Sequence, residues 1–600
     1  MARVLVCSLG PVQDFIAAAR RTRDLWFGSH LLSELSRSAA KHLAEAGWSL
    51  VFPALERGSG DLEPCDSMWR DSGAPPMPVS NHIVAIGEGD VDELCEAARA
   101  AVIRRWERFA TRAAGNAGEL LTRDVDLNRA IDQFLEVVAA WAELDGTGYR
   151  EALREAELAL AARKRLRDFS QWHGTAGLPK STLDGFRETV LARPKDRSAR
   201  AAAIAKSYRI PADEQLDAIG LVKRLGGQPD QFAPISRIAF EPWLTALPPD
   251  TLTEMGKLLR GARAQEIDRR AASWVSRFPF DGELFLPDQR ARALSDLPPE
   301  ERARVAEQLA RLIRGRGSPE PYVACLMADG DKVGEALSGI GTPEKHRAFS
   351  RALADFAMDA RRIAERNGGN LVFSGGDDVL AFLPVAGALQ CARELRQGFA
   401  TYLTAASAGG TPLFASGQAP TLSVGIGIGH VLNPMGSLLE LGRRARELAK
   451  GATEPQSDRR DALGVVVEKR VGSEAAFRGR WHDDPADRIE RVAELLKSGR
   501  LPGGLPYEVR GILARLPRAA QAPVWQAILI QEIRRTVAHK EPGAGDSALT
   551  PAEIELDLPH GPGFEALKQR AASWVDLCLC AQMFARCGQG APPVAQEVAS

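Results

Sequence analysis

The carboxylates best placed to do chemistry in this 600-residue chain lie in the segment Ser374-Gly375-Gly376-Asp377-Asp378. Apolar runs flank this segment on both sides, over residues 370–373 and 379–384. Two glycines between two strands are typical of a tight hairpin, because glycine adopts the positive φ that such turns need. The segment is therefore either a plain glycine-rich turn or a hairpin that presents acids at its tip, as a polymerase-like metal site requires.

A second pair of acids lies upstream, at the end of another apolar run. Residues 322–328 predict a buried strand, and the strand ends in Asp329-Gly330-Asp331. Residues i and i+2 of an extended chain point to the same side, so Asp329 and Asp331 are expected to project together. A hard cation such as Mg²⁺ takes oxygen ligands of this kind. The alternative is a loop that closes with turn-forming Asp and Gly.

The order of the elements around these acids favours the metal-site interpretation. The pattern predicts a strand with terminal acids, a helix, the acid-tipped hairpin, a helix, a strand, a basic helix and a strand. The elements after the first strand cover residues 343–367, 370–384, 386–405, 421–428, 436–450 and 462–468. This is the βαββαβ order of a ferredoxin-like palm with an extra αβ unit.

The charges of this palm suggest how it would hold a nucleoside triphosphate. We expect Asp329, Asp377 and Asp378 to bind two divalent ions, Mg²⁺ or Mn²⁺, with Asp331 as a further ligand. The nucleotide is expected to lie against Ser374, Gly375, Gly376 and Gly330. Lys450, together with Arg443, Arg444 and Arg446, is a candidate for neutralising the triphosphate. The alternative for this basic helix is a solvated surface.

The front of the chain repeats the palm order without the acids. Strands are expected over residues 2–9, 48–52, 82–86 and 131–143, and helices over 11–46 and 91–113. The sequence therefore predicts an α+β protein with two ferredoxin-like palms, whose metal site faces a pocket at their junction. Four regions are expected: a first palm, a mainly helical region, the acid-bearing palm and a C-terminal helical region. Their boundaries are 1–165, 166–318, 319–470 and 471–600.

Three segments resemble a known family. The opening stretch, residues 9–29, reads LGPVQDFIAAARRTRDLWFGS, and residues 177–185 read GLPKSTLDG. Together with Asp329 and the Gly-Gly-Asp-Asp segment, they resemble the large palm-polymerase subunit of type III CRISPR effector complexes, in its III-B (Cmr) version. The resemblance follows the same order over nearly the whole chain.

The resemblance implies a specific activity. Such subunits bind ATP between two palms, and the acid-bearing palm joins ATP into cyclic oligoadenylate when the complex captures target RNA. It also implies partners: other subunits of the complex, guide RNA, target RNA and ATP. Carried over by position, Asp377 and Asp378 bind the metal ions, with Asp329 as their strand-end partner.

The sequence departs from the family pattern in two places. Many members begin with an HD-type nuclease domain, whereas here the first palm begins at residue 2, so we expect no HD-type DNase activity. The family often carries four zinc-binding cysteines between the palms. No cysteine lies between Cys95 and Cys325, and the corresponding region near residues 170–174 lacks the ligands, so we expect no zinc.

Composition excludes several classes of protein. Lys and Arg number 77 against 78 acids, and the net charge of −1 is not that of a free nucleic-acid-binding protein. Arg20, Arg21 and Arg23 form either a local RNA-binding patch or a solvated helix face. Scattered cysteines, no signal peptide and no long apolar run lead us to expect a cytoplasmic protein without membrane contact.

Three other functions remain open from the sequence. A stand-alone diguanylate-type (GGDEF-like) cyclase shares the palm and a similar hairpin, although Asp378 stands where Glu is usual. A variant that joins ATP to S-adenosylmethionine would use the same acids. A catalytically silent scaffold of an RNA complex would retain the palms as relics.

Overall fold

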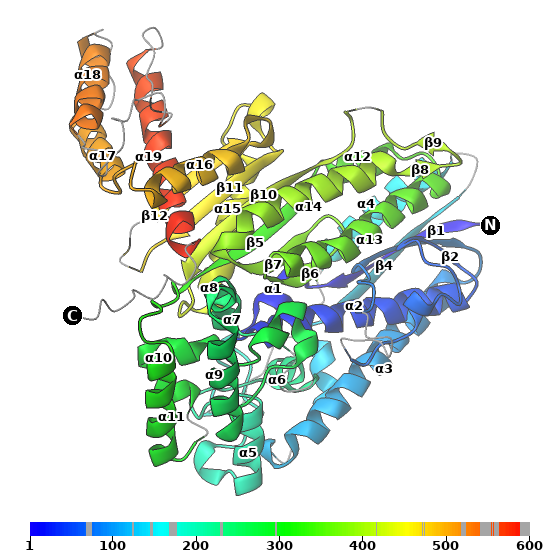
Figure 1. Ribbon diagram of the computed structural model, residues 1–600. Coiled ribbons are helices and arrows are strands. Elements are labelled where there is room, and N and C mark those ends of the chain that lie inside the picture. The colour runs from blue at the N-terminus through cyan, green and yellow to red at the C-terminus, as the bar shows by residue number, and fades with distance from the viewer. Residues whose placement is uncertain are drawn as a thin grey trace.

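Two palms and two helical regions make up the computed structural model (Figure 1). It describes residues 1–67, 75–122, 125–144, 148–166, 177–227, 232–294, 297–415, 417–470, 472, 474–517, 524–539, 554, 556 and 563–588. Residues 170–174, where the sequence lacks zinc ligands, lie outside these ranges. Among the residues described, no helix is both long and apolar enough to cross a membrane.

The first palm is a four-stranded antiparallel sheet with the strand order β2-β3-β1-β4. This is the ferredoxin-like arrangement that the sequence predicts. Its elements are β1 (Arg3–Gly10), α1 (Gln13–Ala17), α2 (Thr22–Glu45), β2 (Ser49–Phe52), β3 (His82–Gly87), α3 (Val91–Ala117), β4 (Glu136–Glu143) and α4 (Tyr149–Arg165).

The long helix expected over residues 11–46 is two helices. The Asp24 carboxylate accepts hydrogen bonds from the backbone N–H groups of Arg20 and Arg21, both at 3.1 Å, and so caps a new helix start. The expected last strand is also shorter, because residues 128–133 form a 3₁₀ helix ahead of β4.

The second palm is a six-stranded sheet with the order β12-β11-β10-β5-β7-β6. Its four core strands, β10-β5-β7-β6, repeat the arrangement of the first palm. Its elements are β5 (Tyr322–Asp331), α12 (Val333–Gly339), α13 (Pro343–Arg366), β6 (Asn370–Ser374), β7 (Val379–Pro384), α14 (Val385–Ala405), β8 (Ser407–Ala408), β9 (Thr411–Pro412), β10 (Thr421–His430), α15 (Met435–Lys450), β11 (Ala462–Glu468) and β12 (Glu474–Arg480).

Strand β12 corrects the domain boundary expected at residue 470. It pairs antiparallel with β11, so the second palm extends to Arg480. The sequence pattern is weak here because β12 is an edge strand whose buried side chains are only Ala475 and Phe477.

Helices form the remaining two regions of the chain. Between the palms lie α5 (Ala199–Ser207), α6 (Ala218–Leu225), α7 (Ile235–Ala239), α8 (Glu241–Ala246), α9 (Pro249–Gly261), α10 (Pro287–Ala293) and α11 (Pro299–Leu312). After β12 come α16 (Pro485–Lys497), α17 (Leu505–Arg515), α18 (Val524–Ala538) and α19 (Phe564–Cys587). Helices α17 and α18 extend away from the palms at the upper left of Figure 1.

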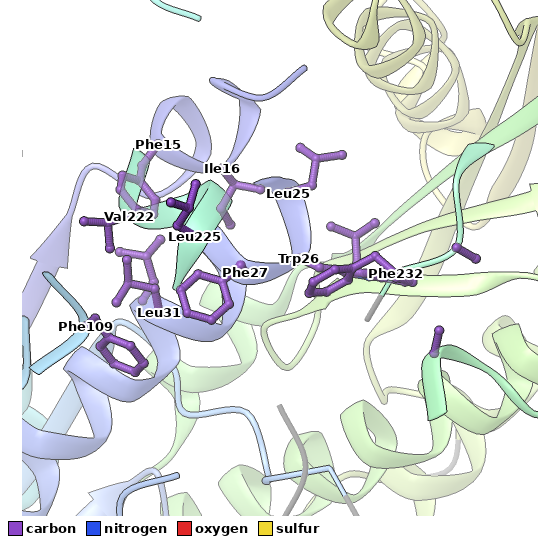
Figure 2. Packing of buried hydrophobic residues seen from close by; sticks show 14 of the residues in the cluster. Phe15, Ile16, Leu25, Trp26, Phe27, Leu31, Phe109, Val222, Leu225 and Phe232 are labelled. Carbon is purple, nitrogen blue, oxygen red and sulfur yellow. The ribbon is translucent and has the colours of Figure 1, made fainter. Parts of the chain in front are cut away.

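Helix α2 is the main packing element of the first half. Its side chains meet α3 through Phe27 and Phe109, and α6 through Leu31 and Leu225, in one apolar cluster (Figure 2). Trp26 reaches further, donating its indole N–H to the carbonyl of Leu371 on β6. The cluster therefore joins the first palm to the strand that leads into the acid hairpin.

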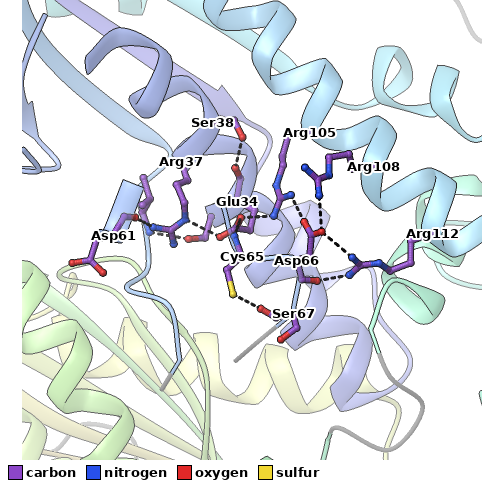
Figure 3. Close-up of polar contacts among 12 residues, drawn as sticks. Glu34, Arg37, Ser38, Asp61, Cys65, Asp66, Ser67, Arg105, Arg108 and Arg112 are labelled. Atoms are coloured by element: carbon purple, nitrogen blue, oxygen red, sulfur yellow. Dashed lines mark hydrogen bonds and ion pairs between the residues drawn. The ribbon is translucent and has the colours of Figure 1, made fainter. Parts of the chain in front are cut away.

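A buried ion network fixes the other side of α2. The Glu34 carboxylate accepts from Arg37 at 2.7 Å and from Arg105 of α3 at 2.6 Å (Figure 3). Asp66 is held in turn by Arg105, Arg108 and Arg112. Removing one member of such a network would leave a buried charge unpaired, which is strongly destabilising. The network therefore stabilises the packing of α2 against α3.

Candidate active site

The hairpin between β6 and β7 presents two acids at its tip. The Gly375 N–H donates to the carbonyl of Asp378 at 3.0 Å, which closes the turn. Gly376 has a φ of 102°, and a Cβ on Gly375 would lie 2.3 Å from the ring of Phe373. Both positions therefore require glycine, for different reasons.

The tip of the hairpin rests on the end of β5. The Gly330 N–H donates to the carbonyl of Asp377 at 3.1 Å. A Cβ on Gly330 would lie 2.8 Å from the Cβ of Asp377. The close approach of the two segments explains why glycine separates Asp329 from Asp331, and it gives Gly330 a packing role.

The two acids of β5 lie on the side of the strand that faces the first palm, because side chains alternate along a strand. Val323, Cys325 and Met327 belong to the apolar core that includes the first palm, whereas the residues between them pack against α13 and α14. Asp329 and Asp331 continue the first set. They lie on one side, as expected, because the Lys450 ammonium contacts both carboxylates.

Burial and mutual repulsion raise the pKa values of the two hairpin acids. The pKa of Asp377 is raised to about 6, mainly by burial, with Asp329 adding repulsion. The pKa of Asp378 is raised to about 7 by burial and by the charges of Asp377 and Asp329. Three carboxylates with too little positive charge between them are a place where a cation would be stabilised.

Lys450 supplies the positive charge closest to these acids. Its ammonium forms an ion pair with Asp329 and donates to the carbonyl oxygens of Asp329 and Gly330, at 3.0 and 3.1 Å. It also donates to Asp331 at 2.9 Å. Lys450 therefore faces the acids in this arrangement, and the expected pairing with a triphosphate requires its ammonium to move.

Asp331 differs from its expected role as a metal ligand. Its carboxylate is only 2% exposed and accepts hydrogen bonds from Thr421 at 2.8 Å, Ser423 at 2.9 Å and the Asp461 N–H at 2.9 Å. With Lys450 added, both oxygens are fully used. The geometry gives Asp331 the role of a buried anchor for Lys450 and β10.

A large cavity opens in front of the hairpin tip, between the two palms. Its volume is about 1110 Å³. Asp377, Asp378 and Gly375 line one side, next to Arg443 and Arg446 of α15. The first palm supplies the opposite side through α4 and the start of β3. The pocket lies at the palm junction, where the sequence places the metal site.

Two expected contributors point elsewhere. Ser374 is 3% exposed and lines a separate small cavity with Trp26 and Ser29, behind the hairpin. Arg444 forms an ion pair with Glu474 of β12. Alternation along the strand and around the helix explains both positions, because neighbours of inward-facing residues face outward.

Sequence patterns did not indicate the first-palm wall of this cavity. His82 contacts Glu157 at 2.9 Å, and Tyr149 contacts His346 of the second palm at 2.6 Å. Arg150 and Arg154 of α4 also line the cavity. The only available signal was the basic, amphipathic character of residues 149–165, which is common on solvated helices.

The carboxylates suit a divalent ion bound together with its substrate. Within the described ranges, no three His, Cys, Asp or Glu side chains form a ready-made cage. Mg²⁺ is normally held by one or two carboxylates plus substrate phosphates, so a complete cage is not required. Asp377, Asp378 and Asp329 are the residues that would hold such ions.

These features define a two-palm protein in which one palm carries a cluster of acids facing the other palm. Residues 322–463 match the family described as Cas10/Cmr2, second palm domain. Residues 4–111 match the family described as CRISPR-associated protein Cmr2, N-terminal. The chain therefore contains two segments that are similar to Cas10/Cmr2 domains, in the order that its opening segment indicates.

A curated relative is similar over part of the chain. The CRISPR system Cmr subunit Cmr2 of Pyrococcus furiosus is 32% identical over 182 residues, covering 26% of this chain and 20% of the relative. The match thus spans about a fifth of that protein's length.

Two solved structures share the fold over nearly the whole chain. The type III-B Cmr-beta complex in its apo state matches with a TM-score of 0.65 at 14% identity, covering 96% of this chain and 81% of that one. The Cmr-beta complex bound to cognate target RNA matches with a TM-score of 0.66 at 14% identity, covering 98% and 83%. The α+β fold with two palms is confirmed.

Proposed function

We propose that this chain is the nucleotidyltransferase of a type III CRISPR effector complex, which converts ATP to cyclic oligoadenylate when the complex holds target RNA. The observation that carries the proposal is the position of Asp377 and Asp378 on the wall of a cavity of about 1110 Å³ between the palms, with Asp329 close enough to repel both carboxylates. Pockets for a single small ligand are usually about 300–1,000 Å³, so this cavity has room for two nucleotides to be joined.

The reaction is a transfer between two nucleotides. The 3′-hydroxyl of one ATP attacks the α-phosphorus of another, a phosphodiester forms, and pyrophosphate leaves with the proton lost by the hydroxyl. Divalent ions, Mg²⁺ or Mn²⁺, held by the carboxylates would activate the hydroxyl and stabilise the leaving pyrophosphate. Intramolecular attack by the last 3′-hydroxyl closes the ring.

The basic residues around the acids balance the charges of the substrate and of the carboxylates. Arg443 and Arg446 line the cavity and neutralise substrate phosphates. The Lys450 ammonium balances Asp329 while the site is empty of cations, and then turns to the triphosphate. Gly375 lines the cavity beside the acids. Gly376 and Gly330 shape the hairpin and its contact with β5, which places the acids at the cavity wall.

The partners of this chain are proposed from its relatives. The Pyrococcus furiosus protein is a subunit of a Cmr system, and one matched Cmr-beta structure holds cognate target RNA. We infer that this chain likewise works with other subunits, guide RNA and target RNA.

The test is product analysis with the assembled complex. Purified complex is incubated with labelled ATP, Mg²⁺ or Mn²⁺ and matched target RNA, and the products are identified by mass spectrometry. We expect cyclic oligoadenylate that depends on target RNA and is lost in the Asp377→Ala/Asp378→Ala variant. Arg446→Ala should reduce the rate strongly, whereas Arg444→Ala on the same helix should have little effect, because Arg444 pairs with Glu474.

Other outcomes identify the alternatives. Product from GTP with the isolated chain would indicate a GGDEF-like cyclase. Product only with S-adenosylmethionine present would indicate the conjugating variant. No product with either metal ion would indicate a silent scaffold.

A further inference from the structure

Two small cavities adjoin each other where the opening motif, the helical region and the second palm meet, away from the acid site. Their volumes are about 130 and 210 Å³, and Arg21, Arg209 and Glu283 line both. We call the two together the basic channel. It is far smaller than the cavity between the palms, so it has space for a phosphate group and not for a nucleotide.

The channel carries an excess of positive charge. Its basic lining residues are Arg20, Arg21, Arg23, Lys206, Arg209 and Arg292. Among the described lining residues, only Asp281 and Glu283 are acidic, and Asp281 is already paired with Arg209. In a chain whose net charge is −1, this concentration of arginine is a local feature that attracts anions.

Arg21 is the clearest sign that a ligand is missing. Its Nε is buried and has no hydrogen-bond partner. In the described part of the chain Arg21 forms no ion pair, and the acids that act on its charge, Asp24 and Glu214, are both paired with Arg224. Burial and the nearby Arg224 charge lower the pKa of Arg21 to about 10. A buried guanidinium nitrogen without a hydrogen-bond partner is costly unless an anion completes the site.

The backbone of Arg209, in the wall of the basic channel, has a strained conformation. It has a φ of 52°, in the left-handed region that residues other than glycine rarely adopt. Strain of this kind tends to be retained where it places a functional group. Here the residue lines both cavities, and its guanidinium is held by Asp281.

The second palm forms one wall of the channel through the loop that begins α15. Val431, Leu432, Asn433 and Met435 line it. From this loop, α15 runs to Lys450 at its other end, which contacts the acids. An anion in the channel would therefore touch the same helix that positions the catalytic lysine.

We propose that the basic channel binds phosphates of a single-stranded RNA backbone, next to the start of α15. The partner class rests on the proposed function, whereas the phosphate chemistry rests on the channel itself. The aromatic lining residues Phe232 and Phe280 are 7% and 0% exposed, so bases cannot stack on them. Recognition is therefore independent of base sequence and sensitive to salt.

The test is RNA binding by the full chain without ATP, measured by fluorescence anisotropy with a labelled single-stranded RNA. Arg21→Gln should weaken binding about tenfold at roughly 100 mM salt, because a charge-assisted hydrogen bond contributes about 1.5–3 kcal/mol. The dependence of log K on log salt should become shallower by about 0.7. Arg20→Gln should act in the same direction, whereas Arg304→Gln on α11, paired with Glu301, should not.

Several outcomes would overturn the proposal. These are unchanged RNA affinity in a folded Arg21→Gln variant, equal loss with Arg304→Gln, or competition by poly-glutamate as effective as that by unlabelled RNA. Pyrophosphate binding measured by calorimetry and lost in Arg21→Gln, with no RNA binding, would assign the channel to a free phosphate instead. Because ATP is left out, failure of oligoadenylate synthesis would not affect this result, and the two proposals fail separately.

Discussion

The Tyr149 hydroxyl and His346 Nδ1 lie 2.6 Å apart and link helix α4 of the first palm to helix α13 of the second. Tyr149 is 5% exposed and His346 is 3% exposed. Burial raises the pKa of Tyr149 and lowers the pKa of His346 to about 4, so both groups are neutral near pH 7. One neutral hydrogen bond therefore joins the palms at the rim of the cavity.

Loss of this bond should loosen the palm interface. Tyr149→Phe leaves a buried imidazole nitrogen without its partner, so we expect the free energy of unfolding to fall by about 1–3 kcal/mol. Urea denaturation followed by circular dichroism measures this change. Tyr507→Phe is the matched control, because Tyr507 is 44% exposed and water replaces its contacts. Equal destabilisation by both substitutions would contradict the role of the interface.

The raised acid pKa values predict how stability depends on pH. Asp377 and Asp378 have pKa values of about 6 and about 7 in the folded protein, above the unfolded value of about 4. Between these values the folded state binds more protons than the unfolded state, so stability falls as pH rises from about 4 to about 7. With metal ions chelated, the Asp377→Asn/Asp378→Asn variant should not show this fall, and its free energy of unfolding near pH 8 should be higher than that of the unsubstituted protein.

Mn²⁺ provides the internal control for the pH prediction. A cation favours the charged carboxylates, so its stabilising effect should grow between about pH 5 and about pH 8. In the Asp377→Asn/Asp378→Asn variant, the stabilising effect of Mn²⁺ should not increase with pH. A pH profile that Mn²⁺ leaves unchanged in the unsubstituted protein would contradict the assignment of these acids as metal ligands.

We expect Asp331 to contribute to the stability of the fold rather than to metal binding. Asp331→Asn places an amide against the donors Lys450, Ser423 and the Asp461 N–H, and we expect a loss of about 3 kcal/mol in the free energy of unfolding. Ser423→Ala removes one hydrogen bond and should cost about 1 kcal/mol. Thermal unfolding of the two variants compares them. If Asp331→Asn is as stable as the unsubstituted protein yet loses Mn²⁺ binding, Asp331 is a metal ligand after all.

Gly330 tests the contact between strand β5 and the hairpin. In Gly330→Ala the new methyl meets Val333 at 2.5 Å and Asp377 at 2.8 Å, so the hairpin tip must shift. We expect a cost of about 1–3 kcal/mol and weaker Mn²⁺ binding, measured by calorimetry. Gly339→Ala is the control, because nothing lies within 4 Å of its new methyl. Equal Mn²⁺ affinity in both variants would argue against the positioning role of Gly330.

The sequence was informative where the signal is local. The acid hairpin and β5 were predicted because apolar runs, glycines and acids follow one another within a few residues. The two palms followed from the order of such elements. The split of the first long helix was missed, because the side chain of Asp24 caps a new helix inside a continuous helical pattern.

The sequence was least informative where distant segments meet. Its position next to Asp329 predicts that Asp331 is a metal ligand. Its hydrogen-bond partners lie on β10 and just before β11, and only the pairing of the strands brings them close to Asp331. Tyr149 and His346 are likewise distant in sequence. Burial, which raises the pKa values of Asp377 and Asp378, depends on the same packing.

The bond from the Gly330 N–H to the Asp377 carbonyl involves only backbone atoms. This contact between the hairpin and β5 therefore does not depend on the carboxylates at positions 377 and 378. A chain that loses both carboxylates would still fold, keep its palm interface and take its place in an assembly. The proposed assembly and the proposed catalysis are thus separable by two substitutions, and the acid-free first palm is an example of a palm fold without these acids.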